Sequence, residues 1–463
     1  MRSESHRSEG DLLLVALLAV VCGAATGLMV AIFRLTLADT NRWRGDLIAQ
    51  AHRIGLGAFF LVVVGCAAAA ATAAWLVRRF STYASGSGIP EVEAALAGTL
   101  PPAPVRRILL VKFIGGILSI GGGMALGPEG PGAQMGAVSG RLLGNLFRRA
   151  RPDVQALVAA GAGAGIGVAF NAPVAGAVFV LEELVRRFEM RIAVAALGAA
   201  ATAILVSRLF LGGAPEFHVV GLGRLTAGAG PLSYAGAATW PLYLALGALA
   251  GIAAAFYNWL IINGLSVSDR FHRWPAEAKA AAIGAVVGAI GWFAPKLIGA
   301  GDNIAQLVLD GGVLAGEIPL FLAIRFFLGP ASYAARTPGG LFAPLLVLGA
   351  LIGFLLGALC QRAFPALAIE PQAFAVVGMA AFFTGVVRAP ITGIVLVIEM
   401  TAAFETLLPI LVACFAAMVA ADLLNVPPIY DSLRERLAAE LKRGRTPPTT
   451  AETDRGKKVP SDC

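Results

Sequence analysis

Long apolar runs without charged residues dominate the chain, and short clusters of arginine and lysine separate them. Leu12 to Phe33 and Ile54 to Val77 contain no Asp, Glu, Lys or Arg. Each run exceeds the roughly 20 residues that an α-helix needs to cross the hydrocarbon core of a bilayer. The pattern therefore predicts an all-α, polytopic membrane protein.

A third uncharged run, from Leu225 to Ser268, is about twice as long as one membrane span needs. We expect it to fold as a helical hairpin, broken either near Pro241 or between Gly247 and Gly251. Glycine and proline are the residues that most readily interrupt a helix.

The composition agrees with a membrane protein. Hydrophobic residues make up 58% of the 463 residues and charged residues only 14%, against about 25% in a soluble domain. The net charge of +8 comes from basic clusters at the ends of apolar runs, where arginine and lysine can contact anionic lipid headgroups. We therefore expect no nucleic-acid partner. Arg2, Arg7 and the basic stretch "LKRGR" predict that both termini are cytoplasmic, which implies an even number of crossings.

No pattern of an enzyme site is present. The five cysteines and four histidines show no metal-ligand spacing, and the glycine runs lack the lysine of a phosphate loop. We therefore expect no metal, no cofactor and no enzymatic activity.

An internal repeat runs through the chain. Residues 161–183 align without gaps on residues 378–400 at an offset of 217. At an offset of 213, "GSG" at 86–88 falls on "GAG" at 299–301, and "GPEGP" at 127–131 falls on "GLFAP" at 340–344. Any one glycine match could be helix packing alone. The ordered series indicates two related halves, which is typical of transporters with a site at the repeat interface.

The repeated motifs have the composition of interrupted helix starts. Glycines permit an irregular backbone, and Pro90, Pro131 and Pro344 fit the first helical turn, where no N–H is lost. A helix N-terminus carries about half a positive charge and free N–H groups, so converging starts predict an anion site.

Five motifs, "GSGIPE", "GPEGP", "AFNAPVAGAVFVLEE", "GGLFAP" and "RAPITGIVLVIEMT", occur in this order over most of the chain. Together they resemble the chloride channel and transporter (CLC) family. The resemblance implies a homodimer of two-repeat, inverted-topology subunits in the cell membrane, each with its own anion pathway. It implies a secondary-active chloride/proton antiporter, with a passive, gated chloride channel as the alternative.

We expect a cytosolic segment at 1–10, a first repeat at 11–215, a second repeat at 216–430, and a cytosolic helix with a disordered tail at 431–463. A tail of that length leaves no room for the nucleotide-binding regulatory domains that many relatives carry.

The resemblance places the anion ligands on the hydroxyls of Ser87 and Tyr430 and on the backbone N–H groups of Leu341 and Phe342. Ser87 could instead cap the following helix, and Tyr430 could be an interfacial anchor. In the family, serine at this position accompanies a preference for chloride. The supporting helix-start residues are Gly86, Gly88, Pro90, Gly127, Gly130, Pro131 and Gly340.

Two glutamates carry the implied proton chemistry. Glu129 matches the external gating glutamate, which competes with the anion, although a glutamate at a helix start can also serve only the helix dipole. Glu183 matches the internal proton-transfer glutamate. Glu182 has a counterpart in Glu399, whereas Glu183 faces Met400 and is unique to one half. Glu182 and Glu183 could instead pair with the arginine four residues further on, Glu182 with Arg186 and Glu183 with Arg187.

One residue departs from the family pattern. The usual motif is G-R-E-G-P, and Pro128 stands here in place of the arginine. We expect its absence either to weaken the attraction of anions to the outer mouth or to change how readily Glu129 takes up a proton.

Overall fold

A computed structural model describes the chain except residues 1, 100–103, 220–238, 315, 368 and 446–463. The described residues form helices and their connections, with one isolated antiparallel bridge between Gly127 and Gly340. The helices of the first half are α1 (Arg2–Ile54), α2 (Gly57–Phe80), α3 (Ile89–Leu96), α4 (Val105–Gly121), α5 (Glu129–Leu146), α6 (Arg151–Phe170), α7 (Pro173–Phe179) with the π-helical turn η2 (Val180–Leu184), and α8 (Met190–Leu211).

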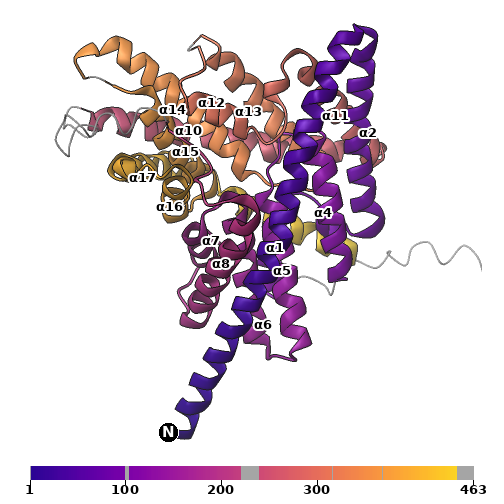
Figure 1. The fold of residues 1–463 in the computed structure, drawn as a ribbon, viewed down its shortest axis with the longest axis vertical. Coiled ribbons are helices and arrows are strands. Elements are labelled where there is room, and N and C mark those ends of the chain that lie inside the picture. The colour runs from indigo at the N-terminus through magenta and orange to yellow at the C-terminus, as the bar shows by residue number, and fades with distance from the viewer. Residues whose placement is uncertain (1, 100–103, 220–238, 315, 368, 446–463) are drawn as a thin grey trace, which may run out of the picture.

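The second half contains a comparable series (Figure 1). Its helices are α10 (Trp240–Arg270), α11 (Ala276–Phe293), α12 (Asp302–Leu309), α13 (Ile318–Ala334), α14 (Phe342–Ala363), α15 (Pro371–Val387), α16 (Pro390–Thr401), α17 (Leu407–Leu423) and α18 (Ile429–Arg445). The predicted all-α fold is confirmed.

Eight helices of the described chain are long and apolar enough to cross a membrane. They differ in how much they are covered by protein: 89% of the most apolar window of α6 is buried and 83% of that of α14, against 28% for α2. Helices α6 and α14 therefore belong to the core of the bundle, and α2 belongs to its periphery.

The break predicted between Gly247 and Gly251 is wrong, whereas the start of α10 at Trp240 agrees with the alternative break near Pro241. Helix α10 continues without a break through Gly247 and Gly251, and Pro241 lies in its first turn, where proline is tolerated. The two glycines serve packing instead, since a Cβ on either would lie 2.3–2.4 Å from a backbone oxygen of α17. Residues 225–238 lie outside the described part of the chain.

The backbone repeats itself between the halves. Gly86 and Gly88 have φ values of 57° and 86°, and their counterparts Gly299 and Gly301 have 80° and 99°. Glycine is needed because other residues rarely adopt this left-handed conformation. Likewise, α6 and α15 both end in a left-handed residue, and both following helices, α7 and α16, begin at a proline.

Small residues allow the central helices to approach one another closely. A Cβ on Gly136 of α5 would lie 1.9 Å from the oxygen of Gly161 on α6, and one on Gly349 of α14 would lie 2.4 Å from that of Gly378 on α15. The glycines matched by the repeat are therefore packing residues as well, in the manner of membrane helix pairs.

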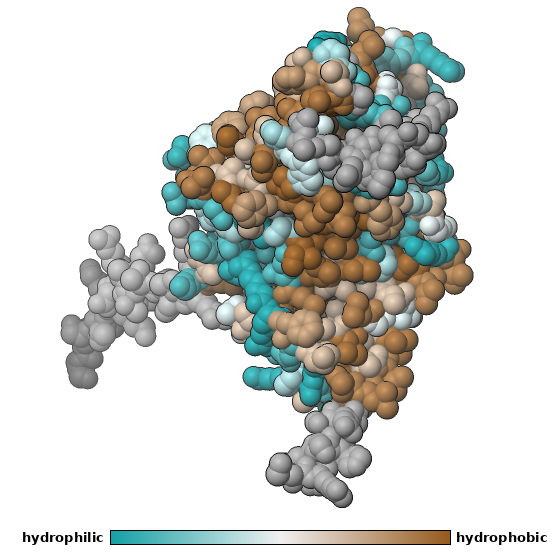
Figure 2. Space-filling model, turned by 90° about the vertical axis from the view of Figure 1, so that its left-hand side faces the viewer, coloured by the Kyte–Doolittle hydropathy of each residue, from teal (hydrophilic) through white to brown (hydrophobic). Residues whose placement is uncertain are grey.

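Helices α7, α8, α16 and α17 lie together on one side of the molecule, at the left of Figure 1. Figure 2 shows that this side is largely hydrophobic. Its exposed side chains include Leu197, Leu205, Ile391 and Phe415, as expected for contact with lipid or another apolar partner.

Candidate anion and proton site

The segments that directly precede α5 and α14 are joined by the bridge between Gly127 and Gly340. Each residue donates its N–H to the carbonyl of the other, at 2.9 and 2.8 Å. The two glycines are 213 residues apart, so the bridge joins equivalent points of the two halves. It brings Glu129, the first residue of α5, beside Phe342, the first residue of α14.

Glu129 is completely buried and touches the start of α14. Its Oε1 accepts a hydrogen bond of 2.6 Å from the backbone N–H of Phe342, while its Oε2 has no partner among the described residues. A Cβ on Gly127 or on Gly340 would lie within 2.2 Å of this carboxylate. The bridge therefore needs glycine on both sides to leave room for the glutamate.

Ser87 lies on the other side of the α5 start. It is buried, and a Cβ on Gly130 would lie 2.6 Å from its carbonyl oxygen. Its Oγ accepts a hydrogen bond of 3.2 Å from the N–H of Ile89, the first residue of α3. Ser87 thus does contact the helix start, but this bond does not use the hydrogen of its hydroxyl group.

Tyr430 is fully buried in the first turn of α18. The interfacial-anchor alternative is wrong, because an anchor of that kind keeps its hydroxyl at the membrane surface. The hydroxyl has no hydrogen-bond partner among the described residues, and its ring centroid lies 6.0 Å from that of Phe342.

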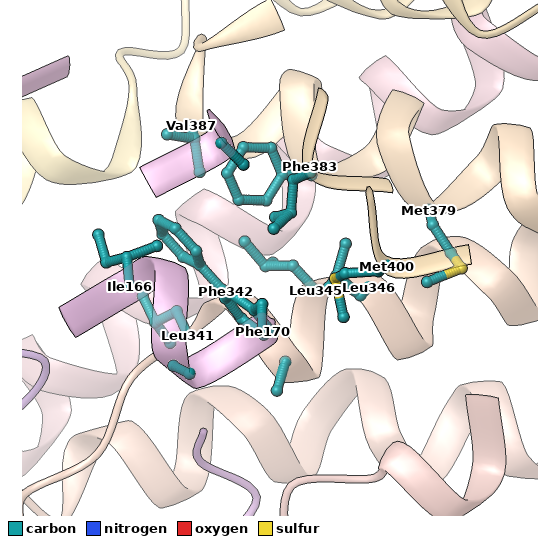
Figure 3. Packing of buried hydrophobic residues seen from close by; sticks show 14 of the residues in the cluster. Ile166, Phe170, Leu341, Phe342, Leu345, Leu346, Met379, Phe383, Val387 and Met400 are labelled. Carbon is teal, nitrogen blue, oxygen red and sulfur yellow. The ribbon is translucent and has the colours of Figure 1, made fainter. Parts of the chain in front are cut away.

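Phe342 is the centre of an aromatic cluster. Its ring stacks on Phe170 at 6.2 Å and meets Phe179 and Phe383 edge to face at 5.3 and 4.7 Å. Figure 3 shows Phe342 among Ile166, Phe170, Leu341 and Phe383. The cluster brings both halves together and excludes water from the side of the site that it covers.

Two buried cations were not singled out by the motifs. Lys112 donates to the carbonyls of Ala84 and Gly86, at 3.2 and 2.8 Å, just before Ser87. Arg325 donates to the carbonyls of residues 297, 299 and 300, just before α12. The two residues are 213 apart, so the repeat offset could have found them.

A further residue, Tyr333 of α13, lies against the same loop. Its hydroxyl is 3.0 Å from where a Cβ on Gly86 would be. No sequence pattern pointed to it, because the contact joins two separate helices.

Glu182 and Glu399 bind each other's half of the molecule. Glu182 accepts the N–H groups of Ile391 and Thr392 at the start of α16, at 3.0 and 2.7 Å. Glu399 accepts those of Val174 and Ala175 at the start of α7, at 3.1 and 2.8 Å. Each carboxylate thus caps a helix of the opposite half, and Glu182 makes no pair with Arg186.

Glu183 is buried beside a cavity of about 640 Å³, which is also lined by Glu182, Arg186, Arg388 and Asp431. Its Oε1 accepts 2.9 Å from Arg186, three residues on. The pairing with Arg187 does not form, because the helix passes into a π-helical turn at residues 180–184 and Arg187 binds Glu189.

Pro128 stands just before α5 and is half-buried. The position next to Glu129 therefore carries no fixed charge, as the sequence indicates.

Glu129 and Glu183 have separate partners: Glu129 binds the start of α14, and Glu183 binds Arg186.

A family model described as voltage gated chloride channel matches residues 69–422. The chain belongs to the voltage-gated chloride channel family. Within this family it is 37% identical over 448 residues to the H(+)/Cl(-) exchange transporter ClcA of Vibrio cholerae serotype O1 (strain M66-2), covering 91% of this chain and 89% of the relative. It is 34% identical over 438 residues to the protein of the same name from Citrobacter koseri, covering 92% and 89%.

Among family structures, a slow cyanobacterial Cl-/H+ antiporter superposes with a TM-score of 0.86 at 31% identity. The superposition covers 93% of this chain and 99% of that one. The predicted membership of the CLC family is confirmed, and these relatives are named as transporters rather than enzymes.

Proposed function

We propose that the protein is a secondary-active chloride/proton antiporter of the cell membrane. The observation that carries the proposal is the Glu129 carboxylate bound to the N–H of Phe342 at the start of α14. A helix start with a free N–H is where an anion would bind. The carboxylate therefore occupies a place that a chloride ion could take.

The proposed exchange follows from competition at that place. Ionised Glu129 binds the α14 start and blocks it. A chloride ion that displaces the carboxylate, or a proton that neutralises it, frees the side chain to leave. Because one side chain competes with the anion and carries the proton, chloride and protons use the outer end of the pathway alternately.

The proposed anion ligands are those that the family resemblance implies. The hydroxyls of Ser87 and Tyr430 and the N–H groups of Leu341 and Phe342 are the donors proposed to hold chloride. In support, all four residues are at most 1% exposed, and the Tyr430 hydroxyl has no protein partner among the described residues. A buried hydroxyl without a partner is unfavourable, so a bound anion would supply the missing acceptor.

Glu183 is the proposed internal proton acceptor. An ionisable residue inside a membrane protein is costly and usually has a function. Its position beside the 640 Å³ cavity gives protons an approach that does not pass Ser87 and Tyr430. This buried acid favours the antiporter over the passive channel.

The assembly and topology follow the family resemblance. We propose a homodimer that packs through the hydrophobic side formed by α7, α8, α16 and α17, with both termini in the cytoplasm. We also propose the two repeats at 11–215 and 216–430 as functional units, with chloride, protons and the bilayer as the partners.

Paired chloride and pH recordings on the purified protein in liposomes test the proposal. An antiporter uses an imposed chloride gradient to move protons against their own gradient. Chloride flux without any proton movement would replace the antiporter with the channel.

A further inference from the structure

Glu183 belongs to a series of five charged side chains that reaches the helix carrying Tyr430 and continues to α3. Arg186 Nη2 lies 2.9 Å from Glu183 Oε1 and 2.6 Å from Asp431 Oδ1. The same Asp431 oxygen accepts 2.8 Å from Arg434, whose other nitrogen lies 3.4 Å from Glu93 Oε2 on α3. We call these residues, Glu93, Glu183, Arg186, Asp431 and Arg434, the ion-pair chain.

The ion-pair chain ends in two buried carboxylates. The side chains of Glu183 and Glu93 are 4% and 3% exposed, whereas Asp431 between them is 23% exposed. One Glu93 oxygen is buried with no partner among the described residues. Each end also borders a cavity, of about 640 Å³ at Glu183 and about 560 Å³ at Glu93.

Its charges leave room for one proton. Its three carboxylates and two guanidinium groups have a net charge of −1 when all are ionised. A single added proton therefore makes the ion-pair chain neutral. Among the other charged groups nearby, Glu182 caps α16, Arg187 binds Glu189 and Arg388 binds Asp422, while Glu435 of α18 also lines the cavity at Glu93.

Asp431 connects this charge to the anion site, because it directly follows Tyr430 in the first turn of α18. A force that holds the Asp431 side chain also holds the backbone of Tyr430. Arg186 exerts that force from a left-handed backbone conformation, with φ of 54°, which is unfavourable without compensating bonds.

We propose that the ion-pair chain makes the position of Tyr430 depend on whether Glu183 carries a proton. With Glu183 ionised, Arg186 is held between two carboxylates and draws the start of α18 toward η2. A proton on Glu183 removes the negative charge from its ion pair with Arg186, so only a weaker hydrogen bond from the guanidinium to a neutral acid anchors Arg186 at η2. Arg186 is then no longer fixed at η2, so it no longer holds Asp431 and the adjacent Tyr430 in place. The affinity of the site for chloride falls as a result.

Asp431 and Arg186 are thus positioning residues that couple proton arrival at Glu183 to chloride release past Tyr430. This inference rests on the roles proposed above for Glu183 as proton acceptor and Tyr430 as chloride ligand. It adds the physical link between them.

Chloride binding to the purified protein, measured by titration calorimetry over a range of pH, tests the link. The background is Glu129→Gln, so that the external glutamate does not titrate. We expect chloride affinity to fall by about fivefold or more from high to low pH, the lower end of usual coupling between sites. Adding Asp431→Asn should abolish that pH dependence, and so should Arg186→Gln, which breaks the same bridge if Asp431→Asn does not fold.

Glu440→Gln is the matched control, because Glu440 also anchors α18, through Arg336 at 2.9 Å, but does not touch the ion-pair chain. It should keep the pH dependence, as should Asp431→Glu. The proposal is overturned if the Glu129→Gln background shows no pH dependence, if Asp431→Asn or Arg186→Gln retains it, or if Glu440→Gln or Asp431→Glu loses it. The binding assay needs no transport, so failure of the antiporter proposal in liposomes is a separate result.

Discussion

Glu129 and the N–H of Phe342 meet because two glycines, one from each half, bridge directly beneath them. At the scale of single residues, this contact explains how a carboxylate can be buried in an apolar bundle. The helix start supplies a hydrogen bond and a partial positive charge, which together offset part of the cost of burial. Oε1 accepts the Phe342 N–H and Oε2 has no hydrogen-bond partner among the described residues, so a chloride ion at this helix start would have to replace the Oε1 bond.

At saturating chloride, Glu129→Gln should leave chloride passage intact while removing its dependence on pH and its coupling to protons. The pH dependence of chloride affinity that acts through Glu183 is expected to remain. The amide has the shape of the protonated acid and no charge with which to compete for the α14 start. Chloride efflux from liposomes at several pH values, with parallel pH recordings, measures both effects. If this variant still pumped protons, the assignment of Glu129 as the gating residue would be wrong.

Ser87→Pro should raise nitrate transport relative to chloride transport. Proline lacks the hydroxyl proposed to donate to the anion, and the bond from the Ile89 N–H to Ser87 Oγ is lost as well. We expect the nitrate-to-chloride ratio to rise by about tenfold. This change corresponds to about 1.4 kcal/mol, which is the scale of one hydrogen bond. An unchanged nitrate-to-chloride ratio would show that the hydroxyl does not contact the anion.

At the scale of helices, the halves hold each other through exchanged caps. Glu182 caps α16 and Glu399 caps α7, so each helix start depends on the opposite half. This arrangement explains why these two glutamates match in the repeat, whereas Glu183 does not.

Glu182→Gln and Glu399→Gln should each lower stability by about 1 kcal/mol, a usual effect of losing a helix cap, and should leave proton coupling in place. Thermal unfolding in detergent, followed by the loss of the monodisperse peak in size-exclusion chromatography, measures the change. A large loss of coupling in either variant, with stability unchanged, would assign that glutamate to proton transfer instead.

Sequence patterns predicted the helices that begin or end at proline and glycine, because those residues act locally. The motifs also brought Glu129, Ser87 and Phe342 into one neighbourhood. They did not predict the Gly127–Gly340 bridge, the Tyr333 contact or the ion-pair chain, since these join segments far apart in sequence. The break expected at Gly247 and Gly251 failed because those glycines pack against α17 rather than end a helix.

At the scale of the whole molecule, Pro128 leaves the position before Glu129 without the positive charge that an arginine would supply to the proposed outer mouth. Pro128→Arg should strengthen chloride affinity measured from the outside, with a larger effect at low salt, because exposed charges are screened over about 10 Å at 0.1 M. Initial rates of chloride uptake at several salt concentrations, adjusted with an impermeant salt, test this. An effect that does not change with salt would mean that other groups set the potential of the mouth.

The central claim is that protons reach Glu129 through Glu183 while chloride passes Ser87 and Tyr430. The most direct measurement is a paired chloride and pH recording on Glu183→Gln in liposomes, with Glu182→Gln as the neighbouring control. We expect Glu183→Gln to move chloride without protons and Glu182→Gln to stay coupled. Full coupling in Glu183→Gln, or equal loss in both variants, would contradict this account.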